Sequence, residues 1–177
     1  MPETDPSGGM AASISASEPD WSRERKGGGA RLVRALRAYH GIGADGRRGR
    51  APGGVVRRVI ALRHRLWQAI CGCDIPLGLT PGGGLILPHP TGIVIHPKPV
   101  IGPNCILFQG VTLGTNRGPG APRIGGHVDI GPGAKILGAI TIGDHAVIGA
   151  NAVVLQDVPA GATAVGIPAR ILTKDAP

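Results

Sequence analysis

The 177-residue chain is poor in aromatic residues, with two Trp, one Tyr and one Phe. This scarcity excludes a core built on large rings, although 42% of the residues are hydrophobic. Three cysteines are too few for the disulfide framework of a small secreted scaffold, and Cys71 and Cys73 lack the spacing of a zinc site. We therefore expect reduced thiols and no bound metal.

Long apolar runs are also missing. No stretch of the sequence reaches eighteen apolar residues, and the first thirty residues contain no apolar run. The first absence argues against a membrane-spanning helix, and the second removes the main sign of an export signal. These features predict a cytoplasmic protein.

Acidic residues are scarce as well: 11 Asp and Glu stand against 19 Lys and Arg, which gives a net charge of +8. The excess positive charge lies in residues 1–73, whereas residues 74–177 are nearly balanced. The arginines have neither interleaved aromatic residues nor a known nucleic-acid motif beside them. The charge therefore favours a solvated helix face and an Arg/Gly linker over nucleic-acid binding.

The first 73 residues divide into a tail and a short basic helical segment. Residues 1–30 have low hydrophobicity and three consecutive glycines, so we expect them to be disordered. Apolar residues at helical spacing predict helices over 31–40 and 55–70, within a basic segment that spans residues 31–73. The second helix could lie on an anionic membrane surface, but packing on its own domain or on a partner subunit is favoured.

From residue 95 the sequence repeats every six residues. The first position of the repeat is aliphatic in all ten copies: Ile95, Ile101, Leu107, Leu113, Ile124, Ile130, Ile136, Ile142, Ile148 and Val154. The second position is glycine in six of the ten, and the fifth holds small or medium side chains. This period predicts a chain that turns after each short strand, so that three repeats form one triangular coil around a narrow aliphatic core. We predict a mainly β fold, a parallel β-helix over residues 74–172, followed by a tail at 173–177.

One insert interrupts the repeat, because Ile124 follows Leu113 by eleven positions rather than six. The inserted sequence TNRGPGAPR has no inward aliphatic residue, so we expect residues 115–123 to form a loop outside the coil. Loops of this kind often carry the function of a solenoid.

The chain resembles the serine acetyltransferase family over residues 74–172. The motifs that carry the resemblance are HPTGIVI (89–95), FQGVTLG (108–114), GPGAKILGAITIG (131–143), IGANAVVLQDVP (148–159) and AVGIPARIL (164–172). The resemblance implies a left-handed parallel β-helix that forms homotrimers with active sites between subunits. It also implies transfer of an acetyl group from acetyl-CoA, a co-substrate, to a hydroxyl group, which for serine gives O-acetylserine for cysteine biosynthesis. No permanently bound cofactor is expected.

The resemblance places the catalytic pair on His89 and Asp74, which lie fifteen positions apart as in the family. A neutral imidazole can remove the proton of a hydroxyl group as it attacks a thioester, and a carboxylate can orient that imidazole. Backbone N–H groups could stabilise the oxyanion. For His96, His127 and His145, positions on corners or outward faces are expected instead.

The resemblance also suggests where CoA and the acceptor would bind. Small residues along a coil edge would let the pantetheine arm approach, although core packing explains two of them, Ala134 and Ala152, equally well. The CoA candidates are Ala134, Gly149, Ala150, Ala152, and, for the adenosine phosphate, Arg170 and Lys174, with Lys135 as an alternative. The loop at 115–123, with Arg123, would shape the acceptor pocket.

Three positions depart from the family pattern and leave the acceptor open. Pro88 stands where the serine enzymes have an aspartate, and Gly120 and Ala121 stand where they have an Arg-His pair that would contact the amino acid. Serine is the favoured acceptor. The alternatives are a sugar hydroxyl in polysaccharide biosynthesis, and a β-helix scaffold whose active site has decayed.

Overall fold

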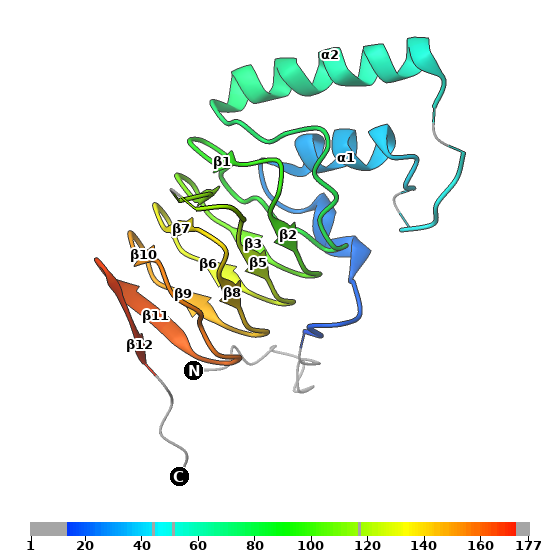
Figure 1. The fold of residues 1–177 in the computed structure, drawn as a ribbon. Helices are drawn as coiled ribbons and strands as arrows, with labels where there is room; N and C mark the ends of the chain where they lie inside the picture. Colours follow the sequence, from blue (N-terminus) through cyan, green and yellow to red (C-terminus); the bar gives the residue numbers. More distant parts are fainter. Residues whose placement is uncertain (1–13, 44, 51, 117, 173–177) are drawn as a thin grey trace.

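The computed structural model describes residues 14–43, 45–50, 52–116 and 118–172. Two helices, α1 (Ala30–Tyr39) and α2 (Gly54–Cys71), lie at one end of a stack of short strands, as Figure 1 shows. The strands are β1 (Val94–Ile95), β2 (Val100–Ile101), β3 (Ile106–Leu107), β4 (Thr112–Gly114), β5 (Arg123–Ile124), β6 (Asp129–Ile130), β7 (Lys135–Leu137), β8 (Thr141–Ile142), β9 (Val147–Ile148), β10 (Val153–Val154), β11 (Thr163–Gly166) and β12 (Ala169–Leu172).

The strands form three sheets that the chain visits in turn. The first sheet is β1-β4-β7-β10, the second is β2-β5-β8, and the third is β3-β6-β9-β11-β12. All neighbouring strands in them pair in parallel, except that β12 runs antiparallel to β11 at the far end. Since each strand from β1 to β9 is followed by a strand of the next sheet, the chain winds as a triangular parallel β-helix.

The aliphatic first positions of the repeat build the core. In the first sheet, Ile95 pairs with Leu113, Leu113 with Ile136 and Ile136 with Val154, so equivalent side chains form one column. All ten first-position residues are buried, and so are the small fifth-position residues. One of the latter is Cys105, whose thiol pKa is raised to about 11, chiefly by burial. The hexapeptide period thus corresponds to one inward column on each sheet.

Some corners of the coil require a left-handed backbone. Asn104 (φ 61°) and Asn151 (φ 56°) adopt it, and so do His127 (φ 51°) and His145 (φ 60°). Asparagine accepts this conformation at lower cost than most residues with a side chain. The left-handed conformation of these corners therefore explains why asparagine stands at two of them, between the buried strands.

The N-terminal segment differs from its expected state. Composition predicts disorder for residues 1–30, but residues 14–30 contain a 3-10 helix, Trp21–Arg25, and contact the coil. The buried side chain of Asn104 donates to the carbonyl oxygens of Ser15 and Glu18, each at 2.7 Å, and accepts from the N–H group of Asp20 at 2.8 Å. These hydrogen bonds order a segment of low hydrophobicity, so the expectation was wrong for residues 14–30. Residues 1–13 lie outside the described part.

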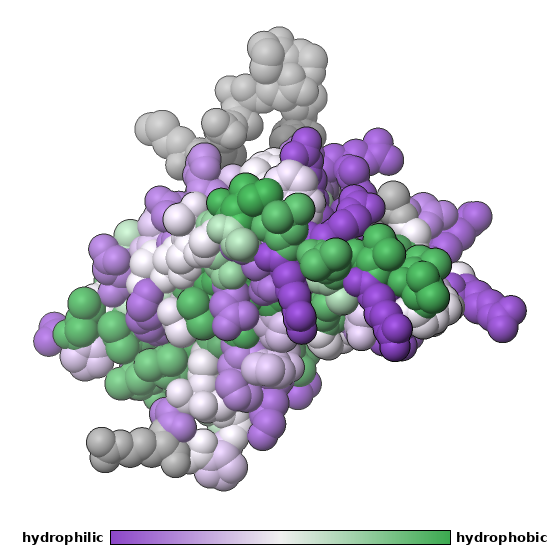
Figure 2. Space-filling view, turned by 90° about the horizontal axis from the view of Figure 1, so that it is seen from above, coloured by the Kyte–Doolittle hydropathy of each residue, from purple (hydrophilic) through white to green (hydrophobic). Residues whose placement is uncertain are grey.

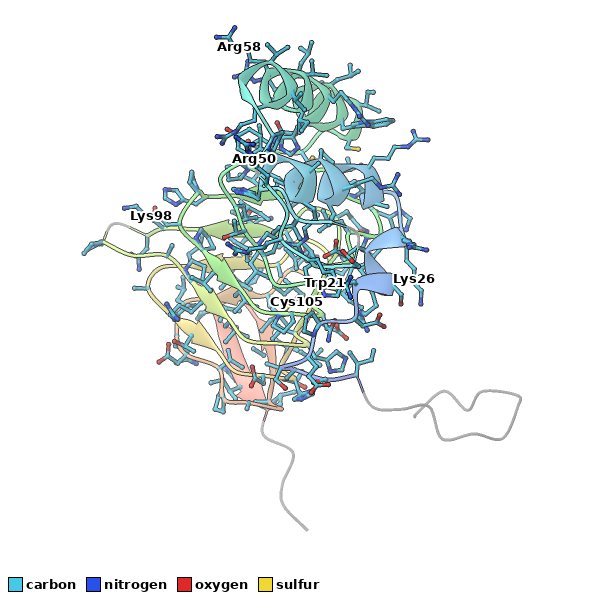
Figure 3. The ribbon with its side chains drawn as sticks, turned by 90° about the vertical axis from the view of Figure 1, so that its right-hand side faces the viewer. Trp21, Lys26, Arg50, Arg58, Lys98 and Cys105 are labelled. Carbon is cyan, nitrogen blue, oxygen red and sulfur yellow. The ribbon has the colours of Figure 1, made fainter. Side chains whose placement is uncertain are left out.

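A buried ion pair joins the 3-10 helix to α1. Arg37 donates to Glu24 at 2.6 Å and to the carbonyl oxygens of Pro81 and Gly82 at 2.6 and 2.7 Å. Its guanidinium group also lies 4.9 Å from the ring of Trp21. In Figure 3, Trp21, the first residue of the 3-10 helix, lies where the N-terminal segment meets the coil. The hydrogen bonds compensate the burial of the Arg37 charge.

Helix α2 packs through the side opposite to its apolar stripe. The half-buried side of the helix faces α1, where Arg31 covers the ring of Trp67 and Arg57 covers the ring of Tyr39. The apolar stripe itself is exposed, so packing of this stripe on the protein's own domain is excluded for the described residues. No helix in this part of the chain is long and apolar enough to cross a bilayer.

Candidate active site

His89 lies on a corner of the first coil, between the third and the first sheet. Ile86 bridges Ile106 of the third sheet just before this corner, and β1 of the first sheet follows it. The turn is closed by a hydrogen bond from the N–H group of Ile93 to the carbonyl oxygen of Pro90 at 3.1 Å. The His89 side chain is exposed, so its ring is open to a bound molecule.

Asp74 begins the first sheet directly beside that corner. Its N–H group donates to the carbonyl oxygen of Ile93 at 2.8 Å, and its carbonyl oxygen accepts from Ile95 at 2.9 Å. Asp74 and His89 therefore lie on adjacent turns of the coil at the same edge. Among the described residues, neither side chain has a hydrogen-bond partner, and both are exposed.

Helix α2 fixes the backbone next to Asp74. The carbonyl oxygen of Ile75 accepts from Gln68 Nε2 at 2.9 Å and lies 2.7 Å from Nε2 of the buried His64. Burial lowers the pKa of His64, while the hydrogen bond to Ile75 and the charge of Asp74 act in the opposite direction. Sequence reasoning gave His64 no role, because a single histidine in an amphipathic helix does not reveal which strand it meets.

Cys73 is half-buried next to Asp74. Its thiol pKa is raised to about 11, first by burial and then by the nearby Cys71 and Asp74. A thiol with this pKa stays protonated at neutral pH and is a poor nucleophile. The groups at this corner that could act as an acid or a base are therefore the imidazole of His89 and the carboxylate of Asp74.

An edge of small residues continues from the His89 corner along the coil. Backbone hydrogen bonds link its successive turns, from Gly110 N–H to Thr91 O (2.9 Å), from Gly133 N–H to Gln109 O (2.8 Å), and from Asn151 N–H to Pro132 O (2.7 Å). Two CoA candidates, the half-buried Gly149 and the exposed Ala150, belong to the last of these turns. Lys135 reaches the same edge, where its ammonium group donates to the carbonyl oxygen of Gly110.

The other CoA candidates are divided between the core and the far end of the coil. Ala134 and Ala152 are fully buried, so their methyl groups face the core rather than this edge. Arg170 is exposed on β12 and lines a cavity of 390 Å³ with Leu155, Gln156 and Ile167–Ala169. Lys174 lies outside the described residues.

Arg123 and His89 lie on different sides of the coil in one chain. Arg123 is exposed on β5 of the second sheet, which is the face opposite to the corner between the third and first sheets. The inserted loop leaves the coil just before it, at the corner between the first and second sheets. Gly120 in this loop has φ 112°, and a Cβ there would lie 2.5 Å from the Cβ of Ala139. A side chain at position 120 would therefore require the loop to move.

Two other coil histidines, His127 and His145, lie on a different corner from His89. The Nδ1 atoms of His127 and His145 lie 2.8 Å apart on the corner between the second and third sheets, so one ring donates to the other. Burial lowers the pKa of His127. Nowhere in the described ranges do three His, Cys, Asp or Glu side chains group closely enough to hold a metal ion.

Comparisons with known proteins agree with the β-helix fold. Residues 121–156 match the family described as bacterial transferase hexapeptide (six repeats). The serine acetyltransferase of Helicobacter pylori (strain J99) is 46% identical over 114 residues, which cover 63% of this chain and 67% of the relative. A soybean serine acetyltransferase complexed with serine has a TM-score of 0.66 at 37% identity, covering 81% of this chain and 57% of that one. A serine acetyltransferase in complex with CoA has a TM-score of 0.65 at 35% identity, with coverages of 81% and 56%. The chain thus spans little more than half the length of the two solved proteins.

Proposed function

Because the chain belongs to the serine acetyltransferase family, we propose that it transfers the acetyl group of acetyl-CoA to the hydroxyl group of L-serine. The family, the left-handed β-helix fold and the acyltransferase class predicted from the sequence are confirmed. The products would be O-acetyl-L-serine and CoA. Such a reaction would belong to cysteine biosynthesis in the cytoplasm.

The observation that supports this activity is the position of His89 and Asp74. Both side chains are exposed at the edge where the first sheet begins, on adjacent turns joined by the hydrogen bonds of Asp74 to Ile93 and Ile95. A hydroxyl group needs a base to become a good nucleophile at neutral pH, and the exposed imidazole of His89 could provide one, with the carboxylate of Asp74 on the adjacent turn to orient it. The backbone of α2 and of the first coil keeps this edge in place.

In the proposed reaction, His89 takes the proton of the serine hydroxyl as its oxygen attacks the thioester carbonyl carbon. The carboxylate of Asp74 stabilises the resulting imidazolium, and backbone N–H groups can stabilise the oxyanion. The C–S bond then breaks, and His89 returns the proton to the CoA thiolate. Every proton and electron pair is accounted for without a covalent enzyme intermediate.

We propose that CoA lies along the edge of small residues. Gly149 and Ala150 would leave room for the pantetheine arm beside the backbone, while the methyl groups of Ala134 and Ala152 only fill the core. The exposed Arg170 would pair with the adenosine phosphate, as would Lys174, with Lys135 as the alternative. The similarity to a serine acetyltransferase solved in complex with CoA supports this assignment.

A homotrimer would complete the acceptor site. Since Arg123 and His89 lie on different sides of one chain, a site that uses both needs a second subunit. Each sheet also exposes a valine to solvent in the single chain: Val94, Val100 and Val147. Subunit contacts would cover part of this apolar surface.

A sugar hydroxyl is the second candidate acceptor, and the inserted loop favours it. Position 120 has no room for a side chain in the present loop, and Ala121 and Pro88 offer no charged group. The Arg-His pair that the family pattern has at positions 120 and 121, next to the amino acid, is therefore missing. The same acetyl transfer to a sugar would not need that pair.

Acceptor profiling tests the proposal. Thiol release from acetyl-CoA is measured with L-serine and with a panel of sugars, and the rate without acceptor is subtracted. The proposal predicts the highest kcat/KM with L-serine. A higher value with a sugar would identify the second candidate, and the absence of CoA binding by calorimetry would indicate a decayed scaffold and refute both.

A further inference from the structure

Helix α2 exposes a continuous apolar stripe on the side that faces away from the β-helix. The stripe repeats at intervals of three and four residues, so its members share one helix face. They are all exposed, with Leu62 at 70% and Leu66 at 57%, and comprise Val55, Val59, Leu62, Leu66 and Ile70. Figure 2, which looks down on this end of the molecule, shows a band of green apolar atoms bordered by purple side chains.

Arginines border the stripe on both sides. At 100° per residue, Arg58 and Arg65 fall along one border and Arg63 along the other. Figure 3 shows Arg58 pointing outward from α2, away from the coil. Helix α2 contains no acidic residue, and further exposed arginines lie on α1 and in the connection before α2: Arg31, Arg34, Arg47, Arg48 and Arg50.

We propose that this face of α2 binds an anionic membrane surface, with the helix axis in the plane of the membrane. Leu62, Leu66 and their apolar neighbours would enter the boundary between headgroups and acyl chains. The bordering arginines would keep their stems against this boundary while their charges reach the lipid phosphates. The helix is outermost at its end of the molecule, so the coil does not block the approach (Figure 1).

Charge complementarity favours a lipid surface over a second copy of the chain. Two α2 helices packed through this stripe would bring Arg58, Arg63 and Arg65 against the arginines of the other copy. Neither helix offers a carboxylate to neutralise them, and like charges at the borders of a helix pair are destabilising. Anionic headgroups supply the missing negative charge. Binding of nucleic acid would leave the apolar stripe in water.

A flotation assay with the full chain tests the proposal. Vesicles of phosphatidylcholine alone are compared with vesicles that also contain phosphatidylglycerol, and the fraction of protein that floats is measured. The chain should float with the anionic vesicles, and much less with the neutral ones. Raising the salt concentration should lower the bound fraction, because salt screens the arginines.

Two matched leucine variants separate the stripe from general effects of a new charge. Leu66→Glu places a carboxylate in the stripe, and Leu172→Glu makes the same change at a residue of similar exposure, 54%, at the other end of the coil. Leu66→Glu should weaken binding to anionic vesicles at least about tenfold, because it removes a large buried apolar side chain from the lipid. Leu172→Glu should bind like the unchanged protein.

Three results would overturn the proposal. The first is equal recovery with neutral and anionic vesicles, or none with either. The second is the same loss of binding in Leu66→Glu and Leu172→Glu. The third is a fall in molar mass by light scattering for Leu66→Glu alone, which would identify a second copy as the occupant. None of these readouts uses acetyl transfer, so they are independent of the proposed activity.

Discussion

Nε2 of His64 lies 2.7 Å from the carbonyl oxygen of Ile75, the residue that follows Asp74. A carbonyl oxygen can only accept a hydrogen bond, so Nε2 carries the ring proton. The other ring nitrogen, Nδ1, is buried and has no partner among the residues that the structure describes. A neutral imidazole therefore connects α2 to the segment that pairs with β1 through Asp74.

This connection predicts that the protein loses stability in mild acid. Burial lowers the pKa of His64 below its usual 6.5, so the unfolded chain binds the proton more readily than the folded one. The stabilisation is complete above pH 6.5 and is lost as the pH falls towards the pKa of the folded state. Urea unfolding at about pH 7.5 and about pH 5.5 should show a lower free energy of unfolding at the lower pH.

His64→Gln should flatten this pH dependence, since the variant no longer takes up the proton. It should not abolish the dependence, because the pKa of His127 is lowered as well and acts with the same sign. His96→Gln is the control, because the ring of His96 accepts a hydrogen bond from the N–H group of Lys98 in its own turn and has no other side-chain hydrogen bond to a described residue. Equal slopes for the two variants would contradict the role given to His64.

Asn104 provides a second test, because it anchors the N-terminal segment. Asn104→Ala removes its three hydrogen bonds to residues 15–20 and should lower the free energy of unfolding by about 2–3 kcal/mol. Limited proteolysis should then cut within residues 14–24 while the coil stays intact. The free energy comes from urea unfolding, and the cleavage sites from mass spectrometry.

Asn151→Ala is the matched control for Asn104→Ala. Asn151 has almost the same backbone conformation, φ 56° against 61°, but its side chain is exposed. It has no side-chain hydrogen bond in the described part of the chain. The control should keep the N-terminal segment protected, and cleavage of that segment in both variants would show that Asn104 is not its anchor.

The repeated part of the fold could be predicted from the sequence because each repeat has an aliphatic residue at its first position, and this residue points into the core. Ile95, Leu113, Ile136 and Val154 are spaced so that they must share one column once the chain turns every six residues. The repeat assigns no role to His89, which could be proposed only because its motif, HPTGIVI, resembles that of the serine acetyltransferase family. The structure places both His89 and Asp74 exposed at one edge of the coil, and their catalytic role stays a prediction.

The helical part could not be predicted in the same way. Amphipathicity shows that α2 has an apolar stripe, but it does not show which side meets the protein. The contacts come from the other side, through His64, Gln68 and the ring of Trp67 under Arg31. The order of residues 14–30 depends on Asn104, about ninety positions away, and no local pattern reveals such a partner.

The charge of Asp74 can be tested without changing its backbone contacts. Asp74→Asn keeps the size of the side chain and the hydrogen bonds of its backbone to Ile93 and Ile95. Its kcat with the best acceptor should fall about 10²-fold or more, because the imidazolium of His89 loses its counter-charge. The KM for acetyl-CoA and the thermal unfolding midpoint should stay near those of the unchanged protein. Asp45→Asn, in the connection before α2, should keep full activity, and an equally active Asp74→Asn would refute the pairing.

The separation of Arg123 and His89 predicts that active sites combine two subunits. Co-expression of Arg123→Ala with His89→Ala should restore activity, because roughly a quarter of the sites in random trimers contain both original residues. Each variant alone should be far less active than the mixture. Mixed trimers that form, as mass spectrometry shows, but remain as inactive as the separate variants would place the whole site in one chain.

The most direct measurement is the rate of thiol release from acetyl-CoA by His89→Ala, with L-serine as acceptor. His89 is exposed, so its loss should leave the circular dichroism spectrum and the binding of CoA unchanged. The predicted result is a fall in kcat of about 10²- to 10⁴-fold, the usual contribution of a general base. A His89→Ala protein that releases CoA as fast as the unchanged one would contradict acid-base catalysis by this imidazole.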